Sequence, residues 1–109
     1  MSRLQTTYVE LGKTLTLNVT YQTTGKVGVT WRKDGKYLYS TVFGPTHPRV
    51  SIKGQATLVL INTTLSNNGT YKNTVATAIT QTYINLIVII QGMYTVIAVS
   101  FPYSFAYLM

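Results

Sequence analysis

The 109-residue chain contains no cysteine, and this absence removes several classes of protein at once. No disulfide framework, thiolate metal site or cysteine nucleophile can form. Acidic residues are almost as scarce, because Glu10 and Asp34 are the only two, and His47 is the only histidine. General acid–base catalysis needs paired carboxylates or an oriented histidine, and these three residues stand far apart in the sequence. We therefore expect no enzyme, and no catalytic, metal-binding or cofactor-binding residues.

Charged residues make up only 10% of the chain, and nine Lys and Arg against two acids give a net charge of +7. Hydrophobic residues reach 46%, a proportion that excludes intrinsic disorder. The basic residues are spread along the chain rather than gathered in a run, so we expect no nucleic-acid binding. Their excess favours solvated positions, with attraction to acidic partners as the alternative.

Alternation of apolar and polar residues with a period of two predicts strands through most of the chain. The clearest run is 15–21, where apolar residues occupy every odd position. Asp34-Gly35 separates two such runs and predicts a type I′ hairpin turn, whose central residues need positive φ. Many short strands divided by turn signals favour an all-β sandwich or barrel. The expected strands cover residues 6–11, 15–21, 27–33, 36–43, 49–52, 56–61, 70–77 and 82–90.

Three residues have a spacing that is typical of one kind of sandwich. Val19 lies in the first clear strand, Trp31 in the next, and Tyr71 in the run NNGTYKN at 67–73. This pattern resembles that of immunoglobulin domains, with Val19 and Asn73 at the two cysteine positions of that family. The resemblance implies an all-β, V-type immunoglobulin-like antiparallel sandwich with Greek-key topology over residues 5–91. It also implies a core signature of Val19, Trp31, Leu60, Tyr71 and Asn73.

The runs LVLINTT (58–64) and NGTY (68–71) resemble those of the carcinoembryonic-antigen-related adhesion molecules. Their membrane-distal V-type domains, like those of the signalling lymphocyte activation receptors, lack the disulfide. This resemblance implies an extracellular or cell-surface protein, either secreted or membrane-anchored. Two departures follow from the residues. Arg49 has no aspartate to pair with, because position 67 is Asn67, and the inward-pointing amide of Asn73 needs a hydrogen-bond partner.

Three sequons, at Asn18, Asn62 and Asn68, permit N-glycosylation. We expect them on or near the sheet of strands A (6–11), B (15–21), D (49–52) and E (56–61). The opposite sheet, of strands G (82–90), F (70–77), C (27–33) and C′ (36–43), is then free for protein contact. Its outward positions are rich in Tyr, Arg and Lys, which favours an interface, although Tyr and Thr also simply form strands well. A bulge in strand C′ would turn Tyr37 or Tyr39 inward. The predicted interface residues are Thr30, Arg32, Tyr37, Tyr39, Lys72, Thr74, Tyr83, Asn85 and Ile87.

Residues 92–109 form an uncharged, apolar tail. An extra strand, a membrane-proximal segment and an altered terminus are the three interpretations of this tail, and the second would allow membrane contact. The predicted function is cell-surface recognition or adhesion, by weak homo-oligomerisation or by binding a related immunoglobulin-like domain. A structural subunit that assembles by strand addition is one alternative. An auxiliary ectodomain of a membrane receptor or channel is the other.

Overall fold

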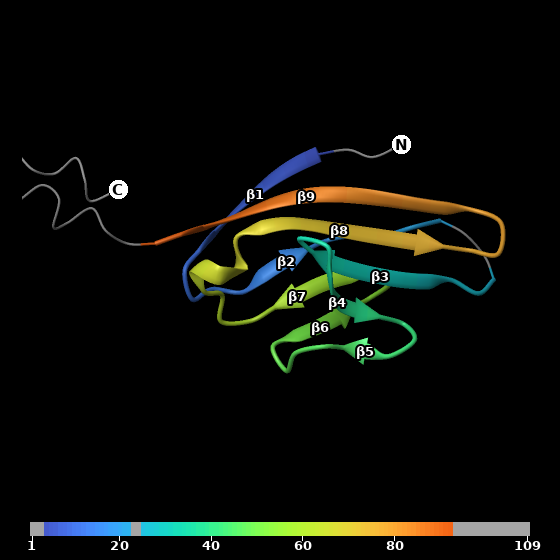
Figure 1. Ribbon diagram of the computed structural model, residues 1–109, viewed down its shortest axis with the longest axis horizontal. Coiled ribbons are helices and arrows are strands. Elements are labelled where there is room, and N and C mark those ends of the chain that lie inside the picture. The colour runs from blue at the N-terminus through green and yellow to red at the C-terminus, as the bar shows by residue number, and fades with distance from the viewer. Residues whose placement is uncertain (1–3, 23–24, 93–109) are drawn as a thin grey trace, which may run out of the picture.

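The computed structural model describes residues 4–22 and 25–92, which form two β-sheets with a single short 3-10 turn. Residues 93–109 of the tail predicted at 92–109 lie outside the described residues. The larger sheet has the strand order β1 (Leu4–Glu10), β9 (Gln81–Gln91), β8 (Gly69–Ala76), β3 (Gly28–Lys33), β4 (Lys36–Ser40) and β5 (Gly44–Pro45). The smaller sheet has the order β2 (Leu15–Leu17), β7 (Thr57–Leu60) and β6 (Val50–Lys53). The 3-10 turn η1 (Leu65–Asn67) connects β7 to β8 (Figure 1).

The chain crosses between the sheets four times, from β1 to β2, from β2 to β3, from β5 to β6 and from β7 to β8. These crossings are the connections of a Greek key. The β8–β9 hairpin, yellow to orange in Figure 1, is the longest feature and runs along the whole sandwich. The predicted all-β sandwich is therefore confirmed.

The first strand lies in a different sheet from the one we expected. The sequence predicts it in the sheet of residues 15–21, 49–52 and 56–61, but β1 pairs parallel with β9, and Val9 lies opposite Ile90. Val9 packs against the core, whereas Tyr8 on the other face is 60% exposed. The pairing covers one edge of the long β9, which would otherwise present unpaired backbone groups to solvent.

The Asp34-Gly35 turn has the predicted geometry. Asp34 has a φ of 50° and Gly35 a φ of 86°, the left-handed region that a type I′ turn requires at both positions. Lys33 and Lys36 pair directly across the turn. The turn therefore fixes the register of β3 against β4, which carry part of the candidate site.

The predicted strand at 15–21 is regular only as far as Leu17. Beyond it, the side chain of Thr57 replaces the backbone ladder, because its Oγ1 accepts from the Val19 N–H at 3.2 Å and donates to the Val19 carbonyl at 3.5 Å. Val19 is still buried, so the alternation of the sequence continues without the strand. The two-residue β5 was not predicted, since Gly and Pro at 44–45 are residues typical of a turn.

Trp31 and Tyr71 lie at the centre of the core, and neither side chain is exposed to solvent. The indole Nε1–H of Trp31 donates to the backbone oxygen of Ala56 at 2.8 Å. The hydroxyl of Tyr71 donates to the backbone oxygen of Asn67 at 2.6 Å, the contact expected of a tyrosine corner. Burial also raises the pKa of this hydroxyl. The buried hydrophobic cluster is completed by Leu15, Leu17, Val19, Val29, Val50, Ala56, Leu58, Leu60, Leu86, Val88 and Ile90.

Asn73 is the exception in this core. It lies opposite Trp31 on β3 and Ile84 on β9, and only 1% of it is exposed. Its Nδ2 has no hydrogen-bond partner among the described residues. A buried polar group left unpaired costs about 1–3 kcal/mol of stability. Asn73 therefore destabilises the sandwich at the position where the family's second cysteine is expected.

The variant Asn73→Leu tests this cost. Leucine keeps the branched outline of asparagine and removes the unpaired amide, so we expect the free energy of unfolding to rise by about 1 kcal/mol. Urea denaturation measures the change. Asn85→Leu, on the solvent side of the same sheet, is the matched control and should give no comparable gain. A lower stability of Asn73→Leu would contradict the assignment of an unpaired amide.

Candidate protein-recognition face

The outer face of the six-stranded sheet carries most of the predicted interface residues. Residues directly opposite each other on neighbouring strands share a face. Arg32 of β3 lies opposite Tyr37 of β4 on one side and Lys72 of β8 on the other. Lys72 in turn lies opposite Asn85 of β9. These four side chains therefore form one row across four strands.

A second row runs beside the first. Thr30 lies opposite Thr74, and Thr74 lies opposite Tyr83. Ile87 follows Tyr83 at an even spacing along β9 and therefore shares its face. Tyr83 and Tyr37 are 39% and 47% exposed, but Thr74 is only 8% exposed. Because Thr74 lies between Thr30 and Tyr83, it offers little contact surface, and the prediction for this residue is wrong.

Tyr39 does not belong to the face, and the prediction for it is also wrong. Trp31 lies opposite Tyr39. The next residue of β3, Arg32, lies opposite Tyr37, so Leu38 is the extra residue of a bulge. Leu38 and Tyr39 both pack against the hydrophobic core. The bulge thus turns Tyr39 inward, as the alternative interpretation of this strand predicts.

Two basic side chains of the face lie over aromatic rings. The guanidinium carbon of Arg32 is 4.4 Å from the centre of the Tyr37 ring, and its Nη2 donates to the Tyr37 hydroxyl at 2.7 Å. The ammonium nitrogen of Lys72 is 4.4 Å from the centre of the Tyr83 ring. Each such cation–π contact contributes about 0.5–1 kcal/mol at an exposed site. These contacts therefore fix the side chains of Arg32, Tyr37, Lys72 and Tyr83 in the unbound domain.

Phe43 adds to this face and was missed by the sequence analysis. Its ring meets the Tyr37 ring edge-on, with the two centres 5.3 Å apart. Phe43 lies in the turn between β4 and β5, and 54% of it is exposed. The contact depends on how this turn folds back over β4, and no short-range pattern in the sequence predicts that.

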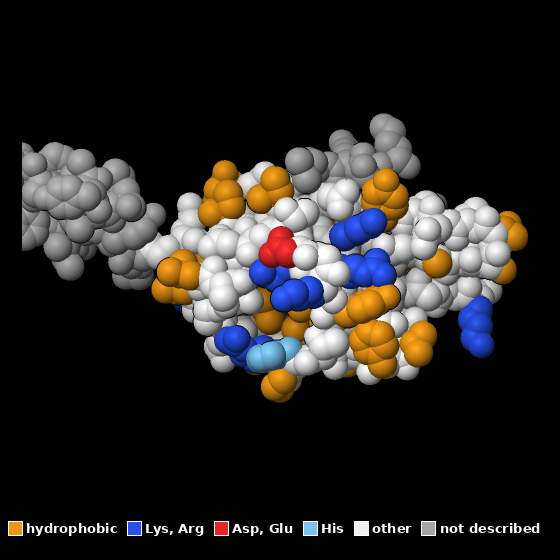
Figure 2. Space-filling view, viewed as in Figure 1, with side chains coloured by type: hydrophobic (Ala, Val, Ile, Leu, Met, Phe, Trp, Pro, Cys, Tyr) orange, Lys and Arg blue, Asp and Glu red, His pale blue; other side chains and the backbone are white. Residues whose placement is uncertain are grey.

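Charge is unevenly distributed on this face. Figure 2 shows basic side chains gathered beside an acidic one over β3, β4 and β8, with hydrophobic side chains around them. Lys33 and Asp34 form the one salt bridge of the described residues, at 3.0 Å. The backbone N–H of Thr70 donates to the other Asp34 oxygen, also at 3.0 Å. Asp34 is thus already paired, which leaves Arg32 and Lys72 without an acidic neighbour in the described part of the chain.

Two features favour glycine at residue 69, its φ of 154°, which other residues rarely adopt, and its contact with Asp34. A Cβ added to Gly69 would lie 2.6 Å from the carboxylate oxygen Oδ2 of Asp34, closer than carbon and oxygen can approach. The β3–β4 turn therefore rests against the start of β8. This contact fixes the position of the strand that carries Lys72.

The Asp34 contact predicts a pH dependence of stability. The Thr70 N–H and then Lys33 lower the pKa of Asp34 below the ordinary aspartate value of 3.8. A lowered carboxyl pKa contributes stability that is complete above the unfolded-state value and is lost as the pH falls through the folded-state value. Asp34→Asn keeps a residue that tolerates positive φ. We therefore expect wild type to exceed Asp34→Asn in stability at pH 7, and the difference to shrink below pH 3.8. Urea titrations at several pH values check this, and a pH-independent difference would contradict it.

The three sequons differ in their surroundings. Asn18 follows β2 and Asn62 follows β7, so both lie at the three-stranded sheet, and both are exposed. Asn68 lies instead at the end of the β8–β9 ladder, because its Oδ1 accepts from the Ile90 N–H at 2.6 Å. Its Nδ2 donates to the Leu65 carbonyl at 2.8 Å. Asn68 is therefore bonded to the six-stranded sheet, although the sequence predicts it on or near the smaller one, and both polar atoms of its side chain are engaged.

Residues 4–22 and 25–92 hold neither a candidate metal site nor a candidate membrane-spanning helix. No three potential metal ligands come together in this part of the chain. No helix in it is long and apolar enough to cross a membrane.

The family follows from the sequence as well as the fold. A family model described as immunoglobulin domain matches residues 5–85, and the chain therefore belongs to the immunoglobulin domain family. Immunoglobulin-like domains are modules commonly used in cell-surface recognition, and the family is not generally enzymatic. No curated protein is significantly similar to the chain in sequence.

Several solved structures are similar to this one. Tim-1 has a TM-score of 0.74 and 17% identity, over 83% of this chain and 94% of that chain. Tim-2 also has a TM-score of 0.74, with 18% identity over 83% of this chain and 94% of that chain. The titin Ig tandem domains A164-A165 have a TM-score of 0.70 and 24% identity, over 82% of this chain and 45% of that chain. At these identities the similarity establishes the fold alone.

Proposed function

We propose that the domain is a cell-surface recognition module that binds another protein through the outer face of the six-stranded sheet. This surface is called the recognition face below. The observation that carries the proposal is the pair of cation–π contacts, Arg32 on Tyr37 and Lys72 on Tyr83, on adjacent strands. The recognition face comprises Thr30, Arg32, Tyr37, Phe43, Lys72, Tyr83, Asn85 and Ile87.

The chemistry of these side chains supports an interface. Tyr and Arg are enriched among the residues that dominate binding energy, because they bury a large area and still form hydrogen bonds. Binding normally costs the entropy of long side chains that become fixed. Arg32 and Lys72 already rest on rings at 4.4 Å, so less of that entropy is lost when a partner binds.

The charges favour an acidic partner over a second copy. A two-fold homodimer would bring Arg32 and Lys72 of both copies to the same interface. The whole chain offers only Glu10 and Asp34 to offset them, and Asp34 is paired with Lys33. We therefore propose weak self-association that salt strengthens. Binding to an immunoglobulin-like domain or another protein with an acidic surface is expected to weaken with salt.

The setting of the module is also a proposal. The resemblance of 58–64 and 68–71 to the carcinoembryonic-antigen-related adhesion molecules supports an extracellular, cell-surface location. The exposed sequons Asn18 and Asn62 lie at the three-stranded sheet. Glycans there would cover that sheet and leave the recognition face open.

Charge reversal tests the recognition face. With an immobilised polyglutamate peptide as the acidic probe, Arg32→Glu combined with Lys72→Glu should weaken binding at least tenfold, about 1.4 kcal/mol. Binding by the wild type should fall as salt is added. The stability of the double variant should fall by no more than about 1 kcal/mol per site, the contribution of the cation–π contact that each substitution removes. Surface plasmon resonance at two salt concentrations measures the effect.

The matched control reverses two lysines elsewhere. Lys53 lies on β6 in the other sheet and Lys13 lies in the turn before β2, and both are exposed. Lys13→Glu combined with Lys53→Glu removes the same net charge and should have a smaller effect. If both double variants lose binding equally, only the net charge matters and the proposed face is wrong.

A structural subunit is the second candidate function. Its supporting observation is that β1 and β2 are edge strands of the described sheets, with one side of each backbone unpaired. Such an edge accepts an added strand from a neighbour. Size-exclusion chromatography over a dilution series separates the candidates. Polymers that survive dilution would favour strand addition, weak reversible dimers would favour adhesion, and a strict monomer would favour an auxiliary ectodomain.

A further inference from the structure

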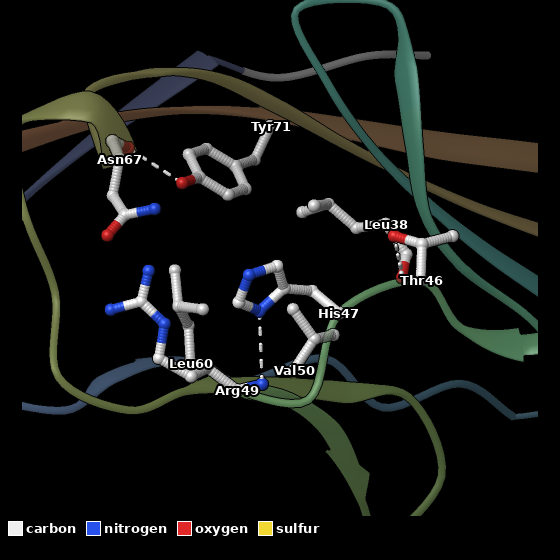
Figure 3. A pocket seen from close by; sticks show the side chains of 8 residues that line it. All are labelled: Leu38, Thr46, His47, Arg49, Val50, Leu60, Asn67 and Tyr71. Carbon is white, nitrogen blue, oxygen red and sulfur yellow. Dashed lines mark hydrogen bonds between the residues drawn. The ribbon is translucent and has the colours of Figure 1, made fainter.

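A cavity of about 180 Å³ lies between the sheets at the edge formed by β4 and β6, and none of its lining residues belongs to the recognition face. Figure 3 shows the side chains that line it. Part of its wall is apolar, from Leu38, Val50 and Leu60. Three nitrogen-bearing side chains also line it, those of His47, Arg49 and Asn67. The lining residues are Leu38, Thr46, His47, Arg49, Val50, Leu60, Asn67 and Tyr71.

The amide of Asn67 presents its nitrogen to the cavity. Its Oδ1 accepts from the backbone N–H of Thr64 at 2.7 Å and from the Thr64 hydroxyl at 3.3 Å. These bonds hold the oxygen away from the cavity and fix the orientation of the amide. The Nδ2 group, which carries two donor hydrogens, is on the cavity side in Figure 3.

Arg49 and His47 supply further donors. One guanidinium nitrogen of Arg49, Nη1, donates to the backbone oxygen of Asn62 at 2.6 Å and anchors the side chain beside the cavity. The backbone N–H of Arg49 donates to Nδ1 of His47 at 3.2 Å. Since Nδ1 is the acceptor, the ring hydrogen is on Nε2, which Figure 3 places on the cavity side.

No carboxylate balances these donors. The two acids of the chain are Glu10 and Asp34, and neither lines the cavity. Asp34 is bound to Lys33 and Thr70. The hydroxyl groups at the cavity are already used as donors, by Thr46 to backbone carbonyls and by Tyr71 to Asn67. The cavity therefore has the positive charge of Arg49 and N–H donors from three side chains. Among the described residues, no carboxylate lines it to accept hydrogen bonds from these donors.

We infer that this cavity binds a small oxyanion, a carboxylate or phosphate group. Guanidinium, amide and imidazole N–H groups are the donors that recognise such groups, and charge-assisted bonds are the strongest of their kind. Liquid water occupies about 30 Å³ per molecule, so the cavity has room for an anion of a few heavy atoms. The inference does not depend on the recognition face.

The test is an NMR titration of the ¹⁵N-labelled domain with sodium phosphate or sodium acetate, at constant ionic strength kept with sodium chloride. We expect saturable shifts of the Arg49 Nε–H and the Asn67 side-chain amide. Saturation by both salts indicates a general oxyanion site, and saturation by phosphate alone indicates a phosphate site. Shifts that rise linearly without saturation, or that map to Arg32 and Lys72 instead, would overturn the inference.

Two variants and one control sharpen the test. Arg49→Met keeps the apolar stem and should weaken anion binding at least tenfold. Asn67→Asp places a carboxylate of the chain itself in the cavity, so it should raise the melting temperature and abolish the response to phosphate. Arg32→Met removes the same charge from the recognition face and should leave the response unchanged. If Asn67→Asp binds phosphate as wild type does, the inference fails, even if Arg49→Met does not fold.

Discussion

The hydrogen bond from Trp31 to the Ala56 carbonyl is the interaction on which the rest of the structure depends. Trp31 belongs to β3 in the larger sheet, and Ala56 directly precedes β7 in the smaller one, so this 2.8 Å bond joins the two layers at the centre of the core. The chain has no cysteine to make such a link covalently. Tyr71 adds a second anchor, from β8 to the turn that enters it. Packing around the buried rings of Trp31 and Tyr71 therefore replaces the link that a disulfide makes between the two sheets elsewhere in the family.

The recognition face is a consequence of the same two anchors. Side chains of a strand alternate between its two faces, so burying Trp31 turns Arg32 outward, and burying Tyr71 turns Lys72 outward. The register between β3 and β8 then brings Arg32 and Lys72 opposite each other. The core and the proposed interface are thus the two sides of one pair of strands, and neither can shift without the other.

Patterns among residues close together in the sequence predicted the features that those residues themselves determine. The Asp34-Gly35 turn and the buried positions of Trp31 and Tyr71 all follow from alternation, turn residues and spacing. The errors arose where the pairing with another strand decides. The bulge at Leu38 reversed Tyr39, and pairing with β9 moved β1 to the other sheet. The cavity beside Arg49 is lined by residues from five segments of the chain, which no local pattern brings together. The only sign of it in the sequence was Asn67, at a position where the family has an aspartate.

The central claim is that packing and hydrogen bonds hold together the positions that a disulfide joins elsewhere in the family. The most direct measurement is thiol quantification in the double variant Val19→Cys with Asn73→Cys, with the two single variants as controls. If these buried positions face each other across the core, the pair should oxidise spontaneously in the folded domain. The bond should stabilise the domain by up to about 4 kcal/mol and raise the melting temperature. Free thiols in a folded, monomeric double variant would contradict the account.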